Sequence, residues 1–112
     1  MALNEELVYR IKEQLDSLNI DHIEMKKMFG GVAFLYKGKM TVGVTNDDLM
    51  VRVVGEKMEK VFEMSGVREM DFTKRSMKEF IFVSADGYDS APLLAYWIEL
   101  GLEHAKRKLN ER

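Results

Sequence analysis

Few side chains in this sequence are of the types that perform chemistry, and they lie far apart along the chain. The two histidines, His22 and His104, have no second metal ligand or nucleophile at a recognisable spacing. We expect His22, beside Asp21, to serve a polar helix-to-strand junction, and His104 to lie near a helix C-terminus that favours positive charge. A metal site would need distant carboxylates, so we predict none.

Carboxylates and hydroxyls form no catalytic pattern either. Asp47 and Asp48 follow Asn46 in a predicted turn, which favours solvated turn formation over an acid–base pair. No serine has a GxSxG-type context, and the chain has no cysteine, which excludes thiolate metal sites and cysteine nucleophiles. We predict no catalytic residue and no cofactor. An enzyme or small-molecule-binding protein of unknown class stays an alternative that a pocket with a partnered histidine would support.

The glycine pair Gly30-Gly31 lies between two strand-like runs, and not at the start of a helix. It therefore lacks the context of a phosphate-binding loop. We interpret it as a bulge or tight turn in which at least one glycine has positive φ or leaves no room for a Cβ atom. Phe29 and Phe34 should then be core anchors on either side.

Basic residues gather in two stretches that form a candidate anion patch. Acidic residues are interleaved elsewhere and the formal net charge is −2, so solvated surface charge is the favoured interpretation. A nucleic-acid-binding module is the alternative. The patch would comprise Lys26, Lys27, Lys37, Lys39, Lys74, Arg75 and Lys78.

Hydrophobic periodicity places these residues on a small set of elements. A helix should begin after the N-cap Asn4 and stop at Asn19, followed by strands over 23–29, 32–36, 40–44 and 49–54 joined by short turns. A short helix should bury Met58, Val61 and Phe62. Strands are then expected over 68–73 and 79–84.

The C-terminal part should contain a turn and a long helix. Asp86-Gly87 predicts a turn, and Ser90 should cap the last helix, whose buried face carries Leu94, Trp97, Ile98, Gly101 and Ala105. The predicted order is α-β-β-β(-β)-α-β-β-α. We therefore expect an α+β fold of two layers, in which a meandering antiparallel sheet carries helices on one face.

Composition fits one domain over residues 1–112. The 46% hydrophobic and 32% charged residues are typical of a soluble globular protein, and no apolar run is long enough to cross a membrane. The acidic N-terminus lacks signal-peptide features, so we expect a cytoplasmic location. A homodimer is a further prediction, because alternating apolar residues could cover a second copy; these are Val42, Val44, Met50 and Val54.

A recurring set of residues runs through the strand region and continues into the last helix. The motif residues are Lys27, Met28, Phe29, Gly30, Gly31, Gly38, Lys39, Met40, Leu49 and Arg52. Further matches are Phe72, Met77-Lys78 and, in the last helix, Tyr96-Trp97. In content and in the spacing of its segments, this set resembles the N-terminal domain of the TfoX/Sxy family, although the family often has arginine at the place of Lys27.

The resemblance implies a secretion-chaperone-like two-layer domain and a link to regulation of natural competence. Two-domain members carry a C-terminal helical domain and work with the cyclic-AMP receptor protein as transcriptional co-activators. This sequence ends at Arg112, so we expect a single-domain member. The family supplies no catalytic residues. The sequence thus favours a non-enzymatic regulatory domain that binds a protein partner or a second copy of itself.

Overall fold

The computed structural model describes residues 4–28, 31–72 and 75–109, with side chains described except at 28 and 69–78. Phe29, Gly30 and Lys74 therefore lie outside the described residues. The elements are α1 (Glu5–Ser17), β1 (Ile23–Met28), β2 (Gly31–Tyr36), β3 (Lys39–Thr45), β4 (Asp48–Arg52), η1 (Gly55–Lys57), α2 (Met58–Val61), β5 (Val67–Phe72), β6 (Arg75–Val83), α3 (Ala85–Tyr88) and α4 (Ala91–Lys108).

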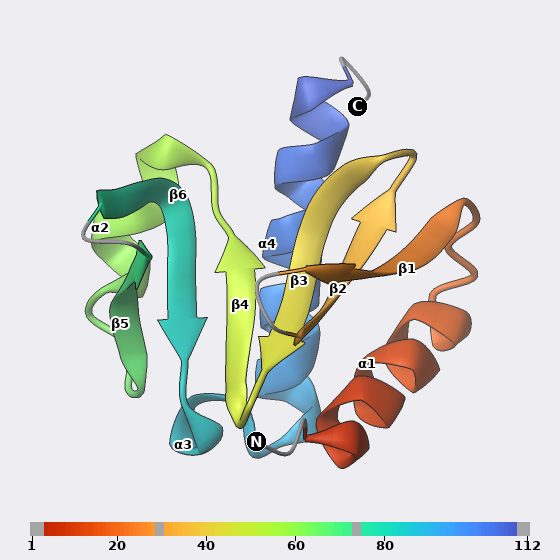
Figure 1. Cartoon of the computed structure of the whole chain (residues 1–112), viewed down its shortest axis with the longest axis horizontal. Coiled ribbons are helices and arrows are strands. Elements are labelled where there is room, and N and C mark those ends of the chain that lie inside the picture. The colour runs from red at the N-terminus through yellow and green to blue at the C-terminus, as the bar shows by residue number, and fades with distance from the viewer. Residues whose placement is uncertain (1–3, 29–30, 73–74, 110–112) are drawn as a thin grey trace.

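The six strands form one antiparallel sheet in the order β1-β2-β3-β4-β6-β5 (Figure 1). The expected meander is confirmed from β1 to β4, and beyond it β6, not β5, pairs with β4. After β4, the chain passes through η1 and α2 before β5 forms the outer edge. It then returns along β6, which closes the gap between β5 and β4.

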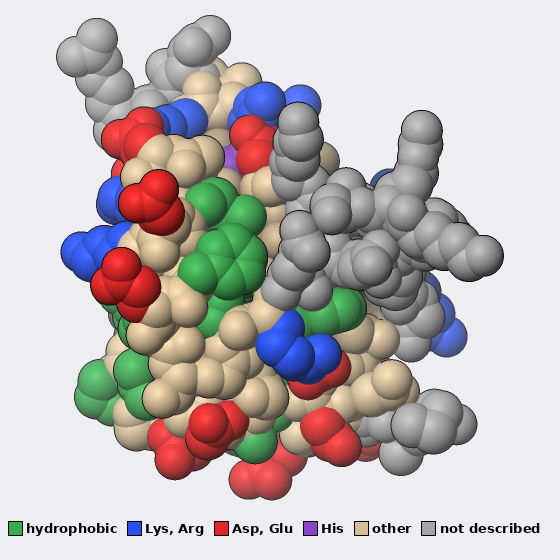
Figure 2. Space-filling view, turned by 90° about the vertical axis from the view of Figure 1, so that its left-hand side faces the viewer, with side chains coloured by type: hydrophobic (Ala, Val, Ile, Leu, Met, Phe, Trp, Pro, Cys, Tyr) green, Lys and Arg blue, Asp and Glu red, His purple; other side chains and the backbone are tan. Residues whose placement is uncertain are grey.

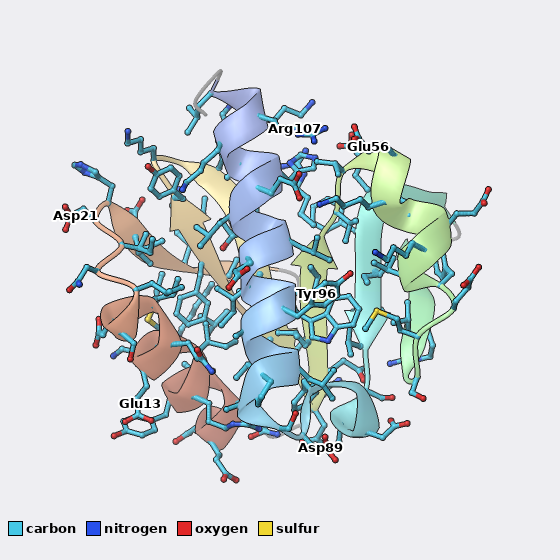
Figure 3. The ribbon with its side chains drawn as sticks, turned by 180° about the vertical axis from the view of Figure 1, so that it is seen from behind. Glu13, Asp21, Glu56, Asp89, Tyr96 and Arg107 are labelled. Atoms are coloured by element: carbon cyan, nitrogen blue, oxygen red, sulfur yellow. The ribbon has the colours of Figure 1, made fainter. Side chains whose placement is uncertain are left out.

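The longer helices cover one face of this sheet, as predicted for a two-layer α+β fold. Seen from behind, α4 crosses the middle of the sheet, with α1 and α2 on either side of it (Figure 3). Trp97 and Ile98 of α4 are fully buried against the strands. Gly101 lets the helix approach β3 closely, since a Cβ there would lie 2.5 Å from the carbonyl oxygen of Thr41.

The helix-ending signals read from the sequence are confirmed. Asn4 Oδ1 accepts a hydrogen bond from the Leu7 amide at 3.0 Å, and Ser90 Oγ accepts one from the Leu93 amide at 3.3 Å. Asn19 has a φ of 55°, the left-handed conformation that ends a helix. Local polar chemistry therefore sets where α1 and α4 begin and where α1 stops.

Two predictions about short segments are wrong. Asp86-Gly87 lies in the single-turn helix α3, because the Trp97 indole donates to the Gly87 carbonyl at 2.8 Å and ties this segment to α4. Helix α2 spans only four residues, so Phe62 is its C-cap and points outward with 43% of its surface exposed. Val61 is buried as expected.

The sheet has an irregularity that the sequence did not predict, and it is separate from the glycine pair, of which Gly30 lies outside the described residues. The β2–β3 register shifts between Phe34 and Leu35, where Thr41 is the extra residue of β3. The Thr41 hydroxyl donates to the Phe34 carbonyl at 2.8 Å, which satisfies a buried polar group. Gly31 begins β2 with no positive φ, but a Cβ atom there would overlap the Val44 carbonyl oxygen. The expected exclusion of a side chain thus holds at Gly31.

Candidate interaction surfaces and polar sites

The described family-motif residues shape hairpins and core. Lys37 and Gly38, with φ of 51° and 84°, form the two-residue turn between β2 and β3, which matches a type I′ turn. Met40 and Leu49 are buried on opposite faces of the sheet. Lys27 and Lys39, by contrast, are exposed. Among the described motif residues, Gly38 lies in this turn, Met40 and Leu49 lie in the two buried clusters, and both lysines lie on the surface.

The candidate anion patch divides into two groups in the described residues. Lys26 and Lys27 are neighbours on β1 and point to opposite faces of the sheet. Lys39 and Lys37 lie three to five residue pairs further along the hairpin, which is roughly 10–17 Å. Lys74 and the side chains of Arg75 and Lys78 lie outside the described residues.

The face of the sheet without helices carries its own buried apolar cluster. Its members are Ala33, Leu35, Met40, Met50 and Phe80. The apolar surface predicted for a homodimer is therefore wrong. Val42 and Val44 belong to the core beneath the helices, and Val54 and Met50 are buried within the monomer. Because all four side chains are buried within the monomer, none of them is free to contact a second copy.

Arginine side chains cover the aromatic residues of this face. The guanidinium carbon of Arg52 lies 5.1 Å from the centre of the Phe80 ring, and that of Arg68 lies 5.2 Å from the Phe82 ring. Arg68 also pairs with Asp48 at 2.6 Å. Both cations shield apolar surface, and Arg68, with about half of its side chain exposed, also keeps its charge in solvent.

A histidine–carboxylate pair joins α4 to β6 at one end of the sheet. His104 is 2% exposed, and its Nε2 lies 3.1 Å from Glu79 Oε1. Glu79 adopts a φ of 74°, and Arg52 Nη2 lies 3.6 Å from the same carboxylate oxygen. The structure thus gives the buried His104 a partly exposed carboxylate partner, in place of the favourable positive charge that was expected for it near the helix C-terminus.

Burial controls the protonation of this pair. It lowers the pKa of His104, an effect that Glu79 opposes and the charges of Arg52 and Lys108 reinforce. Burial acts to raise the pKa of Glu79, but the hydrogen bond with His104 and the nearby cations outweigh it, so that pKa is lowered. The pair therefore favours a neutral imidazole beside an ionised carboxylate near neutral pH.

The pair lines a cavity of about 280 Å³ together with Val54, Arg107 and Lys108. A partnered histidine in a pocket is the feature that would support an enzyme. Among the described lining residues, however, there is no hydroxyl nucleophile, and the described part of the chain has no cluster of metal-ligating side chains. The hydrogen bond between His104 and Glu79 therefore joins α4 to the bulged strand β6.

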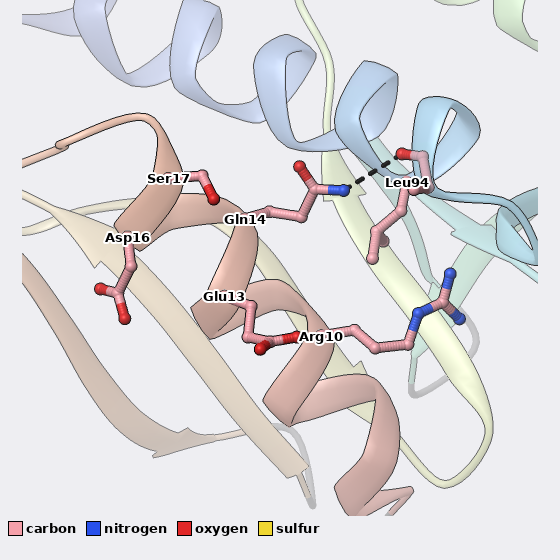
Figure 4. A pocket seen from close by; sticks show the side chains of 7 residues that line it. Arg10, Glu13, Gln14, Asp16, Ser17 and Leu94 are labelled. Carbon is pink, nitrogen blue, oxygen red and sulfur yellow. Dashed lines mark hydrogen bonds between the residues drawn. The ribbon is translucent and has the colours of Figure 1, made fainter.

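A larger hollow of about 530 Å³ lies between α1 and the start of α4 (Figure 4). Its polar lining is engaged in packing. Arg10 donates to the Tyr88 carbonyl at 3.0 Å, and Gln14 donates to the Ala91 carbonyl at 3.1 Å. These bonds hold α1 against the α3–α4 corner, so the side chains of Arg10 and Gln14 already have partners.

A groove of about 450 Å³ between the end of α1 and α4 has different chemistry. Leu18, Ile20 and Leu102 give it apolar side chains, and charged residues of α4 form its rim. Leu18 is 43% exposed because it is the C-cap of α1 and lies past the buried helical stripe. The sequence analysis missed this groove, since only the fold brings Leu18 to α4.

The rim of this groove, which we call the α1–α4 groove, is partly neutralised. Glu103 accepts from Lys57 at 2.7 Å and from Arg107 at 3.0 Å. Glu99 is exposed and has no ion pair among the described residues. A second apolar group is seen on the side of α2 and β5, where hydrophobic side chains are surrounded by charged ones (Figure 2). The α1–α4 groove combines an exposed apolar residue, Leu18, with a hollow.

Comparison with known proteins identifies the family. No helix in the described residues has the length and apolar character needed to cross a membrane. No curated protein matches the chain. The family model of the TfoX N-terminal domain matches residues 13–105, from the middle of α1 to the last turns of α4. The chain therefore belongs to the TfoX N-terminal domain family, a non-catalytic, competence-related family.

Proposed function

We propose that this chain is a non-enzymatic, cytoplasmic interaction domain of the regulatory kind, which binds a segment of a partner protein in the α1–α4 groove. The observation that carries the proposal is the groove itself, with a half-exposed leucine beside an apolar hollow of about 450 Å³. Apolar hollows with a few polar groups at the rim are typical recognition sites.

The groove fits an amphipathic segment. One apolar side chain of the partner would fill the hollow against Leu18 and Ile20, and a basic residue beside it would pair with Glu99. This segment would contact α4 along its exposed face and leave the buried core unchanged. The separation of the described lysines into two groups favours such a protein partner over a nucleic acid.

Capture from a bacterial extract tests the proposal with a matched pair of variants. Leu18→Asp places a charge in the groove, whereas Tyr9→Asp changes a residue of α1 that is 60% exposed and does not line the groove. Both variants should keep the wild-type circular dichroism spectrum. Loss of a buried leucine contact of about 1.5–3 kcal/mol weakens binding at least tenfold.

The wild type and Tyr9→Asp should therefore capture the same protein, and Leu18→Asp should lose it. Equal capture by both variants would place the interaction elsewhere. A small metabolite that co-purifies with all three proteins, without any captured protein, would contradict an interaction function.

A further inference from the structure

Strand β1 presents an open edge of the sheet, because it lies at the end of the strand order and pairs with β2 alone (Figure 1). The Lys37 amide donates to the His22 carbonyl at 3.1 Å, which makes these two residues a hydrogen-bonded pair. In an antiparallel ladder such pairs alternate with non-bonded ones. The backbone groups of Ile23, Met25 and Lys27 therefore point away from β2 and are available to another strand.

The side chains of this edge alternate in charge. Glu24 and Lys26 are exposed and lie on the face of the sheet without helices, where they are paired with Leu35 and Ala33 of β2. Neither has an ion pair among the described residues. Between them, Met25 is 43% exposed, an unusual position for a large apolar residue on an edge strand.

Two copies of β1 that meet antiparallel about a two-fold axis have few registers available. Pairing centred on Met25 places Glu24 opposite Lys26 of the second copy, twice, and brings the two Met25 residues together in a hydrogen-bonded pair. Pairing centred on Glu24 or on Lys26 instead places two like charges directly opposite each other. Of the three registers centred on Glu24, Met25 and Lys26, the one centred on Met25 pairs opposite charges across the two strands.

We propose that the occupant of this edge is a second copy of the chain, paired through β1 in the register centred on Met25. The proposal goes beyond the proposed function, since β1 contributes no residue to the α1–α4 groove. It joins two sheets into one continuous sheet and covers an edge that would otherwise be exposed. Lys27 then lies beside Ile23 of the second copy, where its aliphatic stem can cover the isoleucine.

Light scattering with size-exclusion chromatography tests the pairing by charge exchange. Lys26→Glu and Glu24→Lys each create two pairs of like charges and should weaken the dimer about tenfold or more. The double variant E24K/K26E restores two opposite pairs and should recover the wild-type dissociation constant within about threefold. Lys60→Glu makes the same charge change as Lys26→Glu at an exposed residue of α2, away from β1, and serves as the control that should keep the wild-type dimer.

A cysteine gives an independent measurement, because the chain has no native cysteine. Hydrogen-bonded pairs place their Cα atoms about 5.5 Å apart, within the roughly 4.4–6.8 Å range of disulfides. Met25→Cys should therefore crosslink into a dimer on mild oxidation, whereas the equally exposed Leu18→Cys should not. A wild type that stays monomeric at about 1 mM, or a dimer unaffected by Lys26→Glu, would overturn the proposal.

Discussion

Replacing Gly31 with alanine should destabilise the protein, whereas the same change at Gly55 should not. A Cβ atom at Gly31 would overlap the Val44 carbonyl oxygen, which is backbone and cannot move without shifting β3. At Gly55, no described atom lies within 4 Å of the position of the new Cβ, and φ is not positive. Both variants add one methyl group to a glycine, and they differ in whether neighbouring atoms occupy the position of that group.

The expected size follows from two opposing effects. Forcing an extra carbon into a packed site costs about 1–3 kcal/mol, and replacing glycine restricts the unfolded chain, which stabilises by about 0.4–1 kcal/mol. Gly31→Ala should therefore lower the free energy of unfolding by roughly 1–2 kcal/mol. With an unfolding entropy of about 0.24 kcal/mol/K for 112 residues, Tm should fall by roughly 4–8 °C.

Thermal unfolding followed by circular dichroism measures both variants against the wild type. Gly55→Ala should keep or slightly raise Tm. If Gly31→Ala keeps the wild-type Tm, the close approach of β2 to β3 is not what requires glycine there. If it also lost partner binding, the family motif would be a recognition site and not a structural one.

Other outcomes follow from the buried polar groups. Burial lowers the pKa of His104 below its ordinary value of 6.5, so on acidification the unfolded chain takes up this proton before the folded chain does. The free energy of unfolding should therefore keep the full contribution of His104 above about pH 6.5 and decrease as the pH falls below that value. The lowered pKa of Glu79 should cause a further decrease in stability near pH 4.5 and below. Urea unfolding midpoints between pH 8 and 4 measure these two decreases. His104→Gln should remove the decrease that begins at about pH 6.5. Thr41→Val leaves the Phe34 carbonyl without its hydroxyl donor and should cost about 1–3 kcal/mol in urea unfolding. Trp97→Phe removes the buried indole hydrogen bond and should lower Tm by a similar energy, measured by calorimetry.

Local chemistry was sufficient to predict most of the elements. Asn4 and Ser90 offer oxygens that cap amides three residues away, and Asn19 tolerates the left-handed conformation. The spacing of Trp97 and Gly101 on α4 also predicts the buried face, because helical periodicity depends only on nearby residues.

Long-range pairing could not be predicted in this way. The pairing of β4 with β6 depends on the path that the chain takes through η1 and α2. The hydrophobic pattern of β4 would suit β5 or β6 equally well as a neighbour. The contact between Glu79 and His104 spans 25 residues and depends on the bulge that gives Glu79 its positive φ. The α1–α4 groove likewise exists only after Leu18 and Leu102 meet.

Site-specific photocrosslinking in bacterial cells tests the central claim, the binding of a protein segment in the α1–α4 groove, most directly. A benzophenone amino acid is placed at Leu18 in one protein and at Tyr9 in another; both are exposed on α1, and only Leu18 lines the groove. We predict that the protein with the benzophenone at position 18 forms a discrete adduct with one partner protein, and that the protein with it at position 9 does not. An adduct at position 9 alone, or at neither position, would contradict the account.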